Sequence, residues 1–302
     1  MNITADAVKQ LRERTGAGMM ECKRALVETQ GDLDAAAELM RKTGLAKADK
    51  KAARVAAEGT IAIARTGRKG VMIEVNCETD FVARGDEFLG FARDVAQAAL
   101  AAAPATLEAL LAAPHGSGTI DEARRALIAK IGENISIRRF VALTGPAALG
   151  TYLHGGRIGA LVTLKAGDEA LARDLAMHVA ALNPAYLDAA AVPGAVLDKE
   201  RQILAEQTKE EKKPPEIIAK MVEGRLRKYL GEITLLGQPF VKDPDTTVEK
   251  LLKGAGASVA EFVRYEVGDG IEKKQDDFVR DVMDQVKANT EDKPEPDKPG
   301  KK

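Results

Sequence analysis

The stretches GRKGVMIEV (residues 67–75) and GRIGALVTL (residues 156–164) decide the fold, because a glycine turn followed by an apolar strand occurs twice in the chain. A Gly-Thr pair precedes each turn and a predicted helix with Ala-Arg-Asp follows each strand, at 59–60 and 92–94 in the first repeat and at 150–151 and 172–174 in the second. A later apolar strand follows each helix, at 135–143 and 261–267. Because glycine turns between strands form hairpins, the pattern predicts a duplicated α+β core with antiparallel sheets.

The first repeat is longer than the second between its strand and its helix. The glycine turns lie 89 positions apart and the Ala-Arg-Asp segments only 80, so the first repeat holds nine extra residues. They fall in NCETDFVARG (residues 76–85), where Phe81 and Val82 stand between charged neighbours. Such a loop either presents a contact to another molecule or folds Phe81 back into the core, and the pattern alone leaves both open.

The N-terminal 45 residues predict three short helices, each ended by a glycine. The helices are expected at residues 4–15, 19–30 and 32–43, before Gly16, Gly31 and Gly44. Glycine just past a helix end readily adopts the left-handed conformation that satisfies the last carbonyls. The apolar residues expected to form their small core are Val8, Leu11, Met20, Leu26, Leu33 and Leu39. The charged segment 46–58 is predicted to connect this module to the core.

An insertion at residues 184–245 separates the helix of the second repeat from its last strand. Two amphipathic stretches flank a charged turn that contains Pro214 and Pro215, which predicts an antiparallel helical hairpin. The hairpin offers a surface for a partner or for a second copy of the chain. The final residues, 291–302, are Lys, Asp, Glu, Pro and Gly and are expected to be disordered.

Charge and composition argue against several classes of protein. The 302 residues include 45 Lys and Arg against 46 Asp and Glu, whereas general nucleic-acid binders carry a basic excess. No apolar run reaches the roughly 20 residues of a membrane span, and no secretory or transit peptide is visible, which predicts a cytoplasmic protein. Motifs of hydrolases, zinc proteases and phosphate-binding loops are missing, so we expect a binding protein without cofactor or metal rather than an enzyme.

The cysteines and histidines carry no recognisable catalytic pattern. Cys22 and Cys77 lie far apart without CxxC spacing, so neither a zinc cage nor a disulfide framework is predicted, and the compartment is expected to be reducing. Both are expected to be small buried side chains. His178 lies on an apolar helix stripe and is expected in the core, while His115 falls in a loop and has no expected role.

Seven longer motifs, in this order, resemble bacterial translation elongation factor Ts. They are LRERTGAGMMECKRAL (11–26), VNCETDFVAR (75–84), KIGENISIRR (130–139), HGGRIGALV (154–162), MHVAALNP (177–184), MVEGRLRKYLGEITLLGQPFV (221–241) and VGDGIEK (267–273). The resemblance extends over about residues 2–280. It implies a ubiquitin-associated-like (UBA-like) three-helix domain, a two-subdomain core, a coiled-coil hairpin and a C-terminal helical module.

The domain boundaries expected from this resemblance agree with the division by pattern. They are 1–55 for the UBA-like domain, 56–148 for the first core subdomain, 149–185 with 228–272 for the second, 186–227 for the hairpin, 273–290 for the C-terminal helical module and 291–302 for the tail.

The resemblance also implies a guanine-nucleotide exchange factor that binds elongation factor Tu in its GDP-bound and nucleotide-free forms. It assigns Thr79, Asp80, Phe81 and Val82 to a loop that disturbs the magnesium and phosphate site of this GTPase. Phe81 would act as an apolar wedge and Asp80 as a charged contact beside it. The resemblance allows a homodimer within a heterotetramer, and neither direct nucleic-acid binding nor membrane binding is expected.

Further partner contacts are implied on two other elements. The resemblance assigns Arg12, Met19, Met20 and Lys23 to a contact with the GTPase domain, and His154 to a contact with a different domain of the same partner. From the residues alone, Met20 could instead fill the small core and His154 could be a solvated turn residue. Two other functions stay open: a binding adaptor built on the three-helix module, which would not need Phe81, and a thiol enzyme using Cys77, for which no motif supplies a base.

Overall fold

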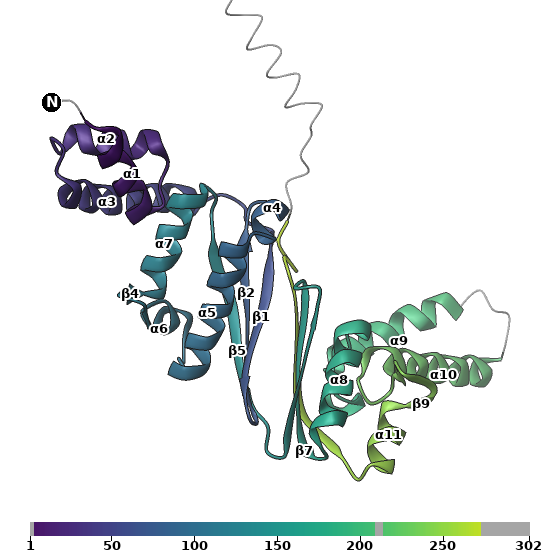
Figure 1. The fold of residues 1–302 in the computed structure, drawn as a ribbon. Helices are drawn as coiled ribbons and strands as arrows, with labels where there is room; N and C mark the ends of the chain where they lie inside the picture. Colours follow the sequence, from purple (N-terminus) through teal and green to yellow (C-terminus); the bar gives the residue numbers. More distant parts are fainter. Residues whose placement is uncertain (1–2, 209–213, 273–302) are drawn as a thin grey trace, which may run out of the picture. The chain divides into compact units, whose positions relative to one another are not determined.

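The computed structural model describes residues 3–208 and 214–272, and residues 1–269 form one compact unit. It contains helices and small antiparallel sheets, so the predicted α+β class is confirmed (Figure 1). The C-terminal helical module predicted at 273–290 and the tail predicted at 291–302 lie outside the described residues. The domain boundaries given above stay predictions.

Three helices pack together near the N-terminus: α1 (Ala5–Thr15), α2 (Met19–Glu28) and α3 (Leu33–Lys51). Thr4 caps α1, since its Oγ1 accepts a hydrogen bond from Ala7 N, and Gly16 ends the helix with a left-handed φ of 67°. Met20 is exposed, so the interpretation of Met20 as a core residue is wrong. The buried core of this module consists of Val8, Leu11, Cys22, Ala25, Leu26 and Ala36, with Leu33 and Leu39 half-buried against it.

The third helix does not end before Gly44 as predicted but continues to Lys51. Glycine inside a helix costs about 1 kcal/mol relative to alanine, so local preference alone favours an end there. Gly44 lies against α7 (Ile120–Ile131), where a Cβ on this glycine would approach the Cβ of Ala129 to 3.3 Å. Close packing of the two helices therefore overrides the local stop signal.

Two three-stranded antiparallel sheets carry the duplication. The first holds β1 (Glu58–Thr66), β2 (Lys69–Cys77) and β5 (Ser136–Thr144) in the order β1-β2-β5, and the second holds β6 (Ala148–His154), β7 (Ile158–Ala166) and β10 (Ser258–Glu266) in the order β10-β7-β6. In each sheet a third strand pairs with the second strand of a hairpin. The register repeats as well, because Gly70 and Glu74 pair with Leu143 and Arg139, and their counterparts Gly159 and Thr163 pair with Tyr265 and Glu261.

The Gly-Thr pairs that precede the two turns do not occupy equivalent positions. Gly59 pairs with Asn76 near the end of β2, whereas Gly150 pairs with Val162 in the middle of β7. In the shared register, Val162 corresponds to Ile73 rather than to Asn76. Strand order and register therefore confirm the duplication, but the equivalence predicted for the Gly-Thr pairs is wrong.

The two sheets pack against each other through a buried cluster formed by Ile61, Met72, Leu143, Leu149, Leu161 and Val267. Two equivalent glycines permit this contact. A Cβ on Gly70 would lie 2.6 Å from Cδ2 of Leu149, and a Cβ on Gly159 would lie 2.6 Å from Cγ2 of Ile61. Each repeat thus leaves room, at the glycine after its turn, for a side chain of the other repeat.

Helices cover the other face of each sheet. α5 (Asp86–Ala102) packs on the first sheet and α8 (Glu169–Leu182) on the second (Figure 1). Along β2 the side chains of Val71, Ile73 and Val75 join the core under the helices, while Met72 joins the contact between the sheets. Between α5 and α7 lie α6 (Leu107–Leu111), β3 (Pro114–His115) and β4 (Gly118–Thr119), which bury Leu110 in the first core.

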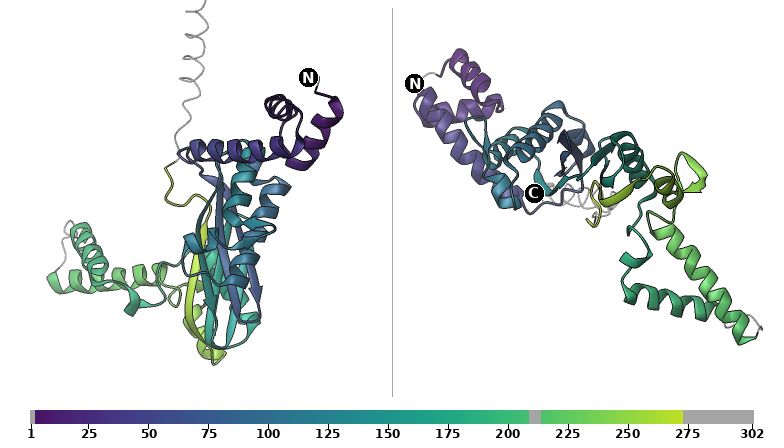
Figure 2. Two further views of the ribbon diagram at one scale, coloured as in Figure 1. Left: turned by 90° about the vertical axis from the view of Figure 1, so that its left-hand side faces the viewer. Right: turned by 90° about the horizontal axis from the view of Figure 1, so that it is seen from below.

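The predicted helical hairpin is present in the second repeat. It consists of α9 (Gly194–Thr208) and α10 (Pro215–Ile233), drawn in green in Figures 1 and 2. α10 continues beyond residue 227, where the hairpin was expected to end. A short 3-10 turn (Ala189–Ala191) precedes the hairpin, and β8 (Pro239–Phe240), β9 (Asp243–Thr247) and α11 (Val248–Gly254) lead from it to β10.

His178 is a buried core histidine, as predicted. Its Nδ1 accepts a hydrogen bond from Val241 N at 3.1 Å, and its Nε2 lies 3.0 Å from Oε1 of Gln238. Because a backbone N–H can only donate, the ring is neutral and carries its proton on Nε2. Burial lowers the pKa of His178, and the Gln238 hydrogen bond partly offsets this effect. Through its two hydrogen bonds the side chain joins α8 to the segment that follows the hairpin.

Among the helices that the structure describes, none is both long enough and apolar enough to cross a bilayer.

Candidate functional site

The segment that lengthens the first repeat contains a one-turn helix, α4 (Asp80–Ala83). Residues 78–85 connect β2 to α5, whereas only residues 167 and 168 connect β7 to α8. Thr79 is the N-cap of α4, and its Oγ1 accepts a hydrogen bond from Val82 N at 3.4 Å. The segment predicted as a loop is therefore a short capped helix at the end of a buried strand.

α4 has one buried side and one open side. Ala83 is buried and Val82 is half-buried against the first core, whereas Phe81 is 85% exposed. The alternative in which Phe81 folds back into the core is therefore wrong. Leaving a phenylalanine in water forgoes about 1.5–3 kcal/mol of burial free energy, so an outward-facing ring on an anchored helix indicates a contact surface.

Asp80 lies beside the exposed ring at the start of α4. Its Oδ2 is 3.0 Å from Nη2 of Arg84, one turn further on, and Arg84 is exposed. An exposed ion pair of this kind contributes little to stability. The carboxylate is therefore free to exchange Arg84 for a cation on another molecule at small cost.

Glu133, in the turn between α7 and β5, holds the start of α4. Its Oε2 accepts hydrogen bonds from the backbone N of Glu78 and of Thr79 at 3.1 and 3.0 Å, and its Oε1 accepts one from Oγ1 of Thr79 at 2.6 Å. In return, Oε1 of Glu78 accepts a hydrogen bond from Asn134 N at 2.6 Å. The residues alone did not point to Glu133, because its partners lie more than 50 positions away; the only signal was its place inside the KIGENISIRR motif.

Cys77, next to this helix, is buried at the end of β2. Burial raises the pKa of its thiol to about 12, and the nearby carboxylates of Glu133 and Glu58 add to the effect. Its Sγ donates a hydrogen bond to the carbonyl of Thr79 at 3.2 Å. Because the thiolate is the reactive form of cysteine, this arrangement argues against a thiol enzyme at Cys77.

The turn between β6 and β7 lies close to α4. A small hollow is lined from one side by Asp80, Ala83 and Arg84 of the α4 segment and from the other by Gly155, Gly156 and Arg157 of the turn. The turn is attached to β1, because Gly156 O accepts hydrogen bonds from Ile61 N at 2.7 Å and from Oγ1 of Thr60 at 3.1 Å. The structure thus brings the β6–β7 turn of the second repeat to the edge of the α4 segment.

His154 is the last residue of β6, immediately before this turn, and it is exposed. Its ring stacks on Tyr152, with 6.3 Å between the ring centroids, and its Nδ1 lies 3.4 Å from the Tyr152 hydroxyl. Leu153 between them is 44% exposed. Because neighbouring side chains of a strand point to opposite faces, Leu153 does not share the surface of Tyr152 and His154. The exposed histidine is compatible with a partner contact as well as with a solvated turn.

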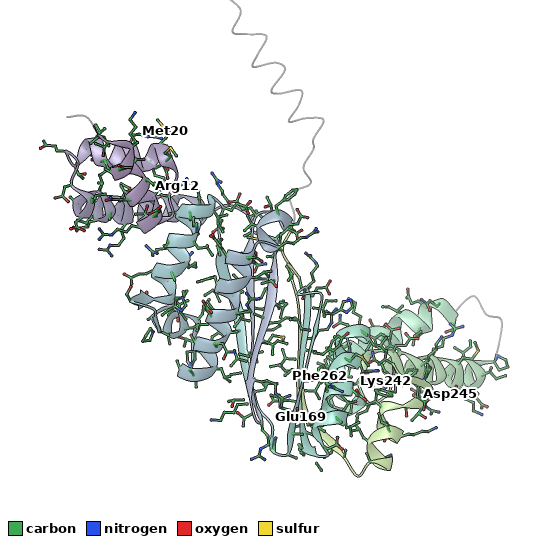
Figure 3. The ribbon with its side chains drawn as sticks, viewed as in Figure 1. Arg12, Met20, Glu169, Lys242, Asp245 and Phe262 are labelled. Carbon is green, nitrogen blue, oxygen red and sulfur yellow. The ribbon has the colours of Figure 1, made fainter. Side chains whose placement is uncertain are left out.

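The remaining predicted contact residues lie on the three-helix module, on elements separate from α4. Arg12 projects from α1 and Met20 from α2 (Figure 3). Met19 and Lys23 also belong to α2. All four are exposed, and Met19 and Met20 are 59% and 63% exposed. Val27 lies two turns beyond Met19 on α2 and is 59% exposed as well, so this helix presents an apolar stripe with a lysine within it.

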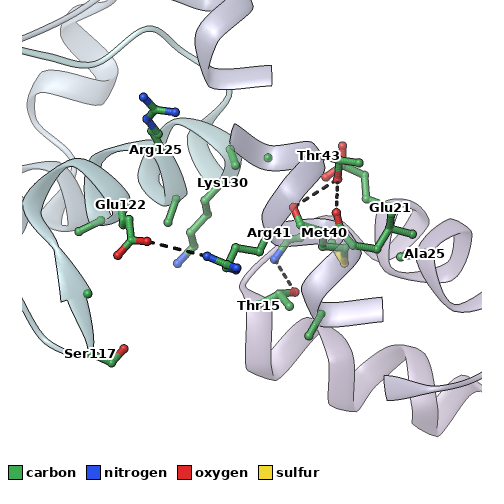
Figure 4. Close-up of a pocket in the computed structure, with 18 of the residues that line it drawn as sticks. Thr15, Glu21, Ala25, Met40, Arg41, Thr43, Ser117, Glu122, Arg125 and Lys130 are labelled. Carbon is green, nitrogen blue, oxygen red and sulfur yellow. Dashed lines mark hydrogen bonds and ion pairs between the residues drawn. The ribbon is translucent and has the colours of Figure 1, made fainter. Parts of the chain in front are cut away.

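A separate pocket is lined by residues of α2, α3, α7 and the β3–β4 turn (Figure 4). Its charged side chains have both signs, and Arg41 and Glu122 approach each other across it, with 3.8 Å between Nη1 and Oε1. None of the predicted contact residues lines this pocket. Over residues 3–208 and 214–272, no three His, Cys, Asp or Glu side chains gather as a metal site.

Comparison with known proteins identifies one family. A family model described as "Elongation factor TS" matches residues 78–269, which begin directly after β2 and contain α4, the second repeat and the hairpin. A protein named Elongation factor Ts from Thioalkalivibrio sulfidiphilus is 58% identical over 292 residues, which cover 95% of this chain and 100% of that protein. Proteins of the same name from Alkalilimnicola ehrlichii and Methylococcus capsulatus are 59% and 57% identical, each covering 96% of this chain and 100% of their own length. On this match, which extends over nearly its whole length, the chain belongs to the elongation factor Ts family of translation elongation factors.

Proposed function

We propose that the chain is a guanine-nucleotide exchange factor that binds elongation factor Tu and promotes the release of GDP, in the cytoplasm and without covalent chemistry. The observation that carries the proposal is Phe81, which stands 85% exposed on a one-turn helix whose other side is anchored. The names of the relatives are consistent with a role in translation elongation.

The physical basis of exchange is reciprocal linkage. A partner that binds the nucleotide-free GTPase more tightly than the GDP-bound form must weaken GDP binding by the same factor. Magnesium and phosphate contacts hold much of a bound nucleotide, so a wedge that displaces the elements around them is an effective lever. Phe81 would supply the wedge, and Asp80, Thr79 and Val82 would orient and flank it.

The other exposed residues would add binding energy away from the wedge. Arg12, Met19, Met20 and Lys23 form a mixed apolar and cationic surface suited to the GTPase domain, because methionine adapts to irregular apolar contacts. His154 would contact a different domain of the partner. The hairpin α9–α10 could support a homodimer within a heterotetramer.

The experiment follows release of a fluorescent GDP analogue from elongation factor Tu in excess unlabelled GDP, with and without this protein. We expect the wild type to accelerate release and Phe81→Ala to lose at least about tenfold of the acceleration, which corresponds to about 1.4 kcal/mol. The melting temperature of Phe81→Ala should stay close to that of the wild type, because the ring is outside the core.

Leu182→Ala is the matched control, since Leu182 is an apolar side chain that is 42% exposed on α8. This variant should accelerate GDP release as much as the wild type does. If the wild type does not accelerate release, the adaptor function becomes the better explanation. If Phe81→Ala exchanges as fast as the wild type, the site is not at α4.

A further inference from the structure

Residues 132–134, between α7 and β5, form a rigid support for α4. Nζ of Lys51 donates a hydrogen bond to Gly132 O at 2.6 Å, and Nδ2 of Asn134 donates to Arg54 O at 2.7 Å. Asn134 is buried. The turn is therefore attached on one side to the last residue of α3 and the segment that follows it, and on the other, through Glu133, to the start of α4.

We propose that Glu133 is a positioning residue for nucleotide exchange and acts only through Phe81; this inference rests on the proposed function. Glu133 does not face outward beside Phe81 but binds the backbone behind it, at Glu78 and Thr79. Its effect on a partner would therefore be indirect, through the direction in which α4 projects its ring.

The geometry explains why α4 needs such a residue. One helical turn is unstable alone, because nucleation fixes several backbone angles for a single hydrogen bond. The Thr79 hydroxyl has one proton, which it donates to Oε1 of Glu133, and this leaves an oxygen lone pair for Val82 N. Glu133 therefore fixes both the backbone before α4 and the orientation of its cap.

Without Glu133, α4 would adopt several orientations, and the Phe81 ring would fit the partner in one of them. A protein whose competent conformation is only partly populated binds with an affinity reduced by that fraction. We therefore expect Glu133→Ala to raise the KM of the exchange reaction for elongation factor Tu by about tenfold, and to leave kcat within about twofold at saturation.

A double-mutant cycle tests the inference. Glu133→Ala, Phe81→Ala and the double variant are compared by kcat/KM for release of the fluorescent GDP analogue. If Glu133 acts through Phe81, it has no further effect once the ring is gone, so the double variant should equal Phe81→Ala. If instead Glu133→Ala lowers kcat/KM by the same factor with and without the Phe81 ring, the inference is overturned, because a general structural loss would act in both backgrounds.

Asp168→Ala is the control for loss of a helix cap. Asp168 caps α8 in the second repeat, where its Oδ1 accepts a hydrogen bond from Leu171 N at 2.8 Å, and no exposed ring depends on it. Its removal should lower stability by a similar amount and leave exchange unchanged. If Glu133→Ala does not fold, Glu133→Gln replaces it, because the amide keeps the shape and one acceptor oxygen; its KM should rise by severalfold.

The outcomes separate the two proposals. A wild type that does not accelerate GDP release overturns the exchange function and the inference with it. A wild type whose activity depends on Phe81, but whose Glu133 variants keep the wild-type KM, overturns only the positioning role. If Glu133→Ala raises the KM in the wild-type background and has no effect in the Phe81→Ala background, both proposals are supported.

Discussion

The two repeats share strand order and register but differ between strand and helix. In the second repeat two residues, Gly167 and Asp168, lead from β7 into α8, and Asp168 caps the helix directly. In the first repeat eight residues make the same connection, and they include α4 with Phe81 on its exposed side. The short connection is sufficient for the fold, so the longer one is not required by the architecture.

The comparison separates the shared scaffold from the proposed site within one chain. Sheet pairing, the contact between the sheets and the covering helices occur in both repeats and account for stability. The exposed ring, its capped helix and the glutamate that holds them belong to the first repeat and have no counterpart in the described connection between β7 and α8. A functional site on a rigid scaffold commonly takes this form, because connections tolerate change where strands do not.

The strongest test makes the first repeat like the second. Replacing residues 78–85 by Gly-Asp would retain the strand and helix while removing α4, and we expect acceleration of GDP release to fall to the background rate. Glu133 loses its partners at Glu78 and Thr79, and the backbone N of Asn134 loses the Glu78 carboxylate, so the melting temperature should fall as well, although unfolding should remain cooperative.

Circular dichroism and calorimetry check the fold of this variant, and the fluorescent GDP assay checks its activity. Insertion of a Gly-Ser pair after Gly167 in the second repeat serves as the control for a changed connection and should leave exchange intact. A folded variant without α4 that still accelerates release would show that exchange lies outside the first repeat's extra residues.

The scaffold could be predicted from sequence because its signals are local. Glycine turns, apolar strands and the Ala-Arg-Asp helices lie within short windows, and the length difference between repeats located the extra residues directly. The conformation of those residues could not be predicted in the same way. α4 depends on Glu133, whose acceptor oxygens reach Thr79 from 54 positions further along the chain.

Two errors have the same origin in long-range packing. Gly44 carries the local signal for a helix end, and only the approach of Ala129 on α7 explains why α3 continues through it. The Gly-Thr pairs resemble each other in sequence, but strand pairing places Gly59 and Gly150 at different heights in their sheets. Local sequence signals therefore predicted which helices and strands form, but not where α3 ends or how the strands of the two hairpins align.

A second difference between the repeats is at Glu74 of β2, whose counterpart in β7 is Thr163. Glu74 is completely buried, and its Oε2 accepts a hydrogen bond from Nε of Arg139 at 2.6 Å, while Nη1 of Arg138 lies 3.1 Å from its Oε1. Oε1 also accepts a hydrogen bond from Gly268 N at 2.8 Å. The carboxylate therefore joins the first repeat to the residues that follow β10.

Glu74→Thr makes the repeats alike at this position and leaves two arginines without their carboxylate. Breaking a buried ion pair costs about 3–5 kcal/mol, and we expect the lower end in the free energy of unfolding, because water reaches part of both arginines. Urea unfolding at pH 7 measures the loss. A loss below about 1 kcal/mol would mean that the cluster contributes little to holding the repeats together.

The pH dependence sharpens this second prediction. Burial raises the pKa of Glu74, but hydrogen bonds from Gly268 N and from Asn76, together with Arg139, outweigh it, so the pKa lies below the ordinary value of 4.5. The folded state therefore binds this proton less tightly than the unfolded state, and the carboxylate stabilises the fold at pH values above 4.5. The difference between wild type and Glu74→Thr should shrink as the pH falls below 4.5, and a difference that stays constant would contradict the assignment.

The smallest expected effect is at Cys77, whose counterpart in the second repeat is Ala166. Because burial raises the thiol pKa to about 12, the thiol stays protonated at neutral pH and should resist iodoacetamide in the folded protein. Cys77→Ala removes one buried sulfur and its hydrogen bond to Thr79 O, which should cost about 1 kcal/mol of stability and change exchange by less than about twofold. Mass spectrometry of the alkylated protein, with the GDP-release assay on the same sample, measures both properties. Rapid alkylation of Cys77 with loss of exchange would instead place the thiol in the mechanism, and the repeats would then differ in chemistry as well as in the length of one connection.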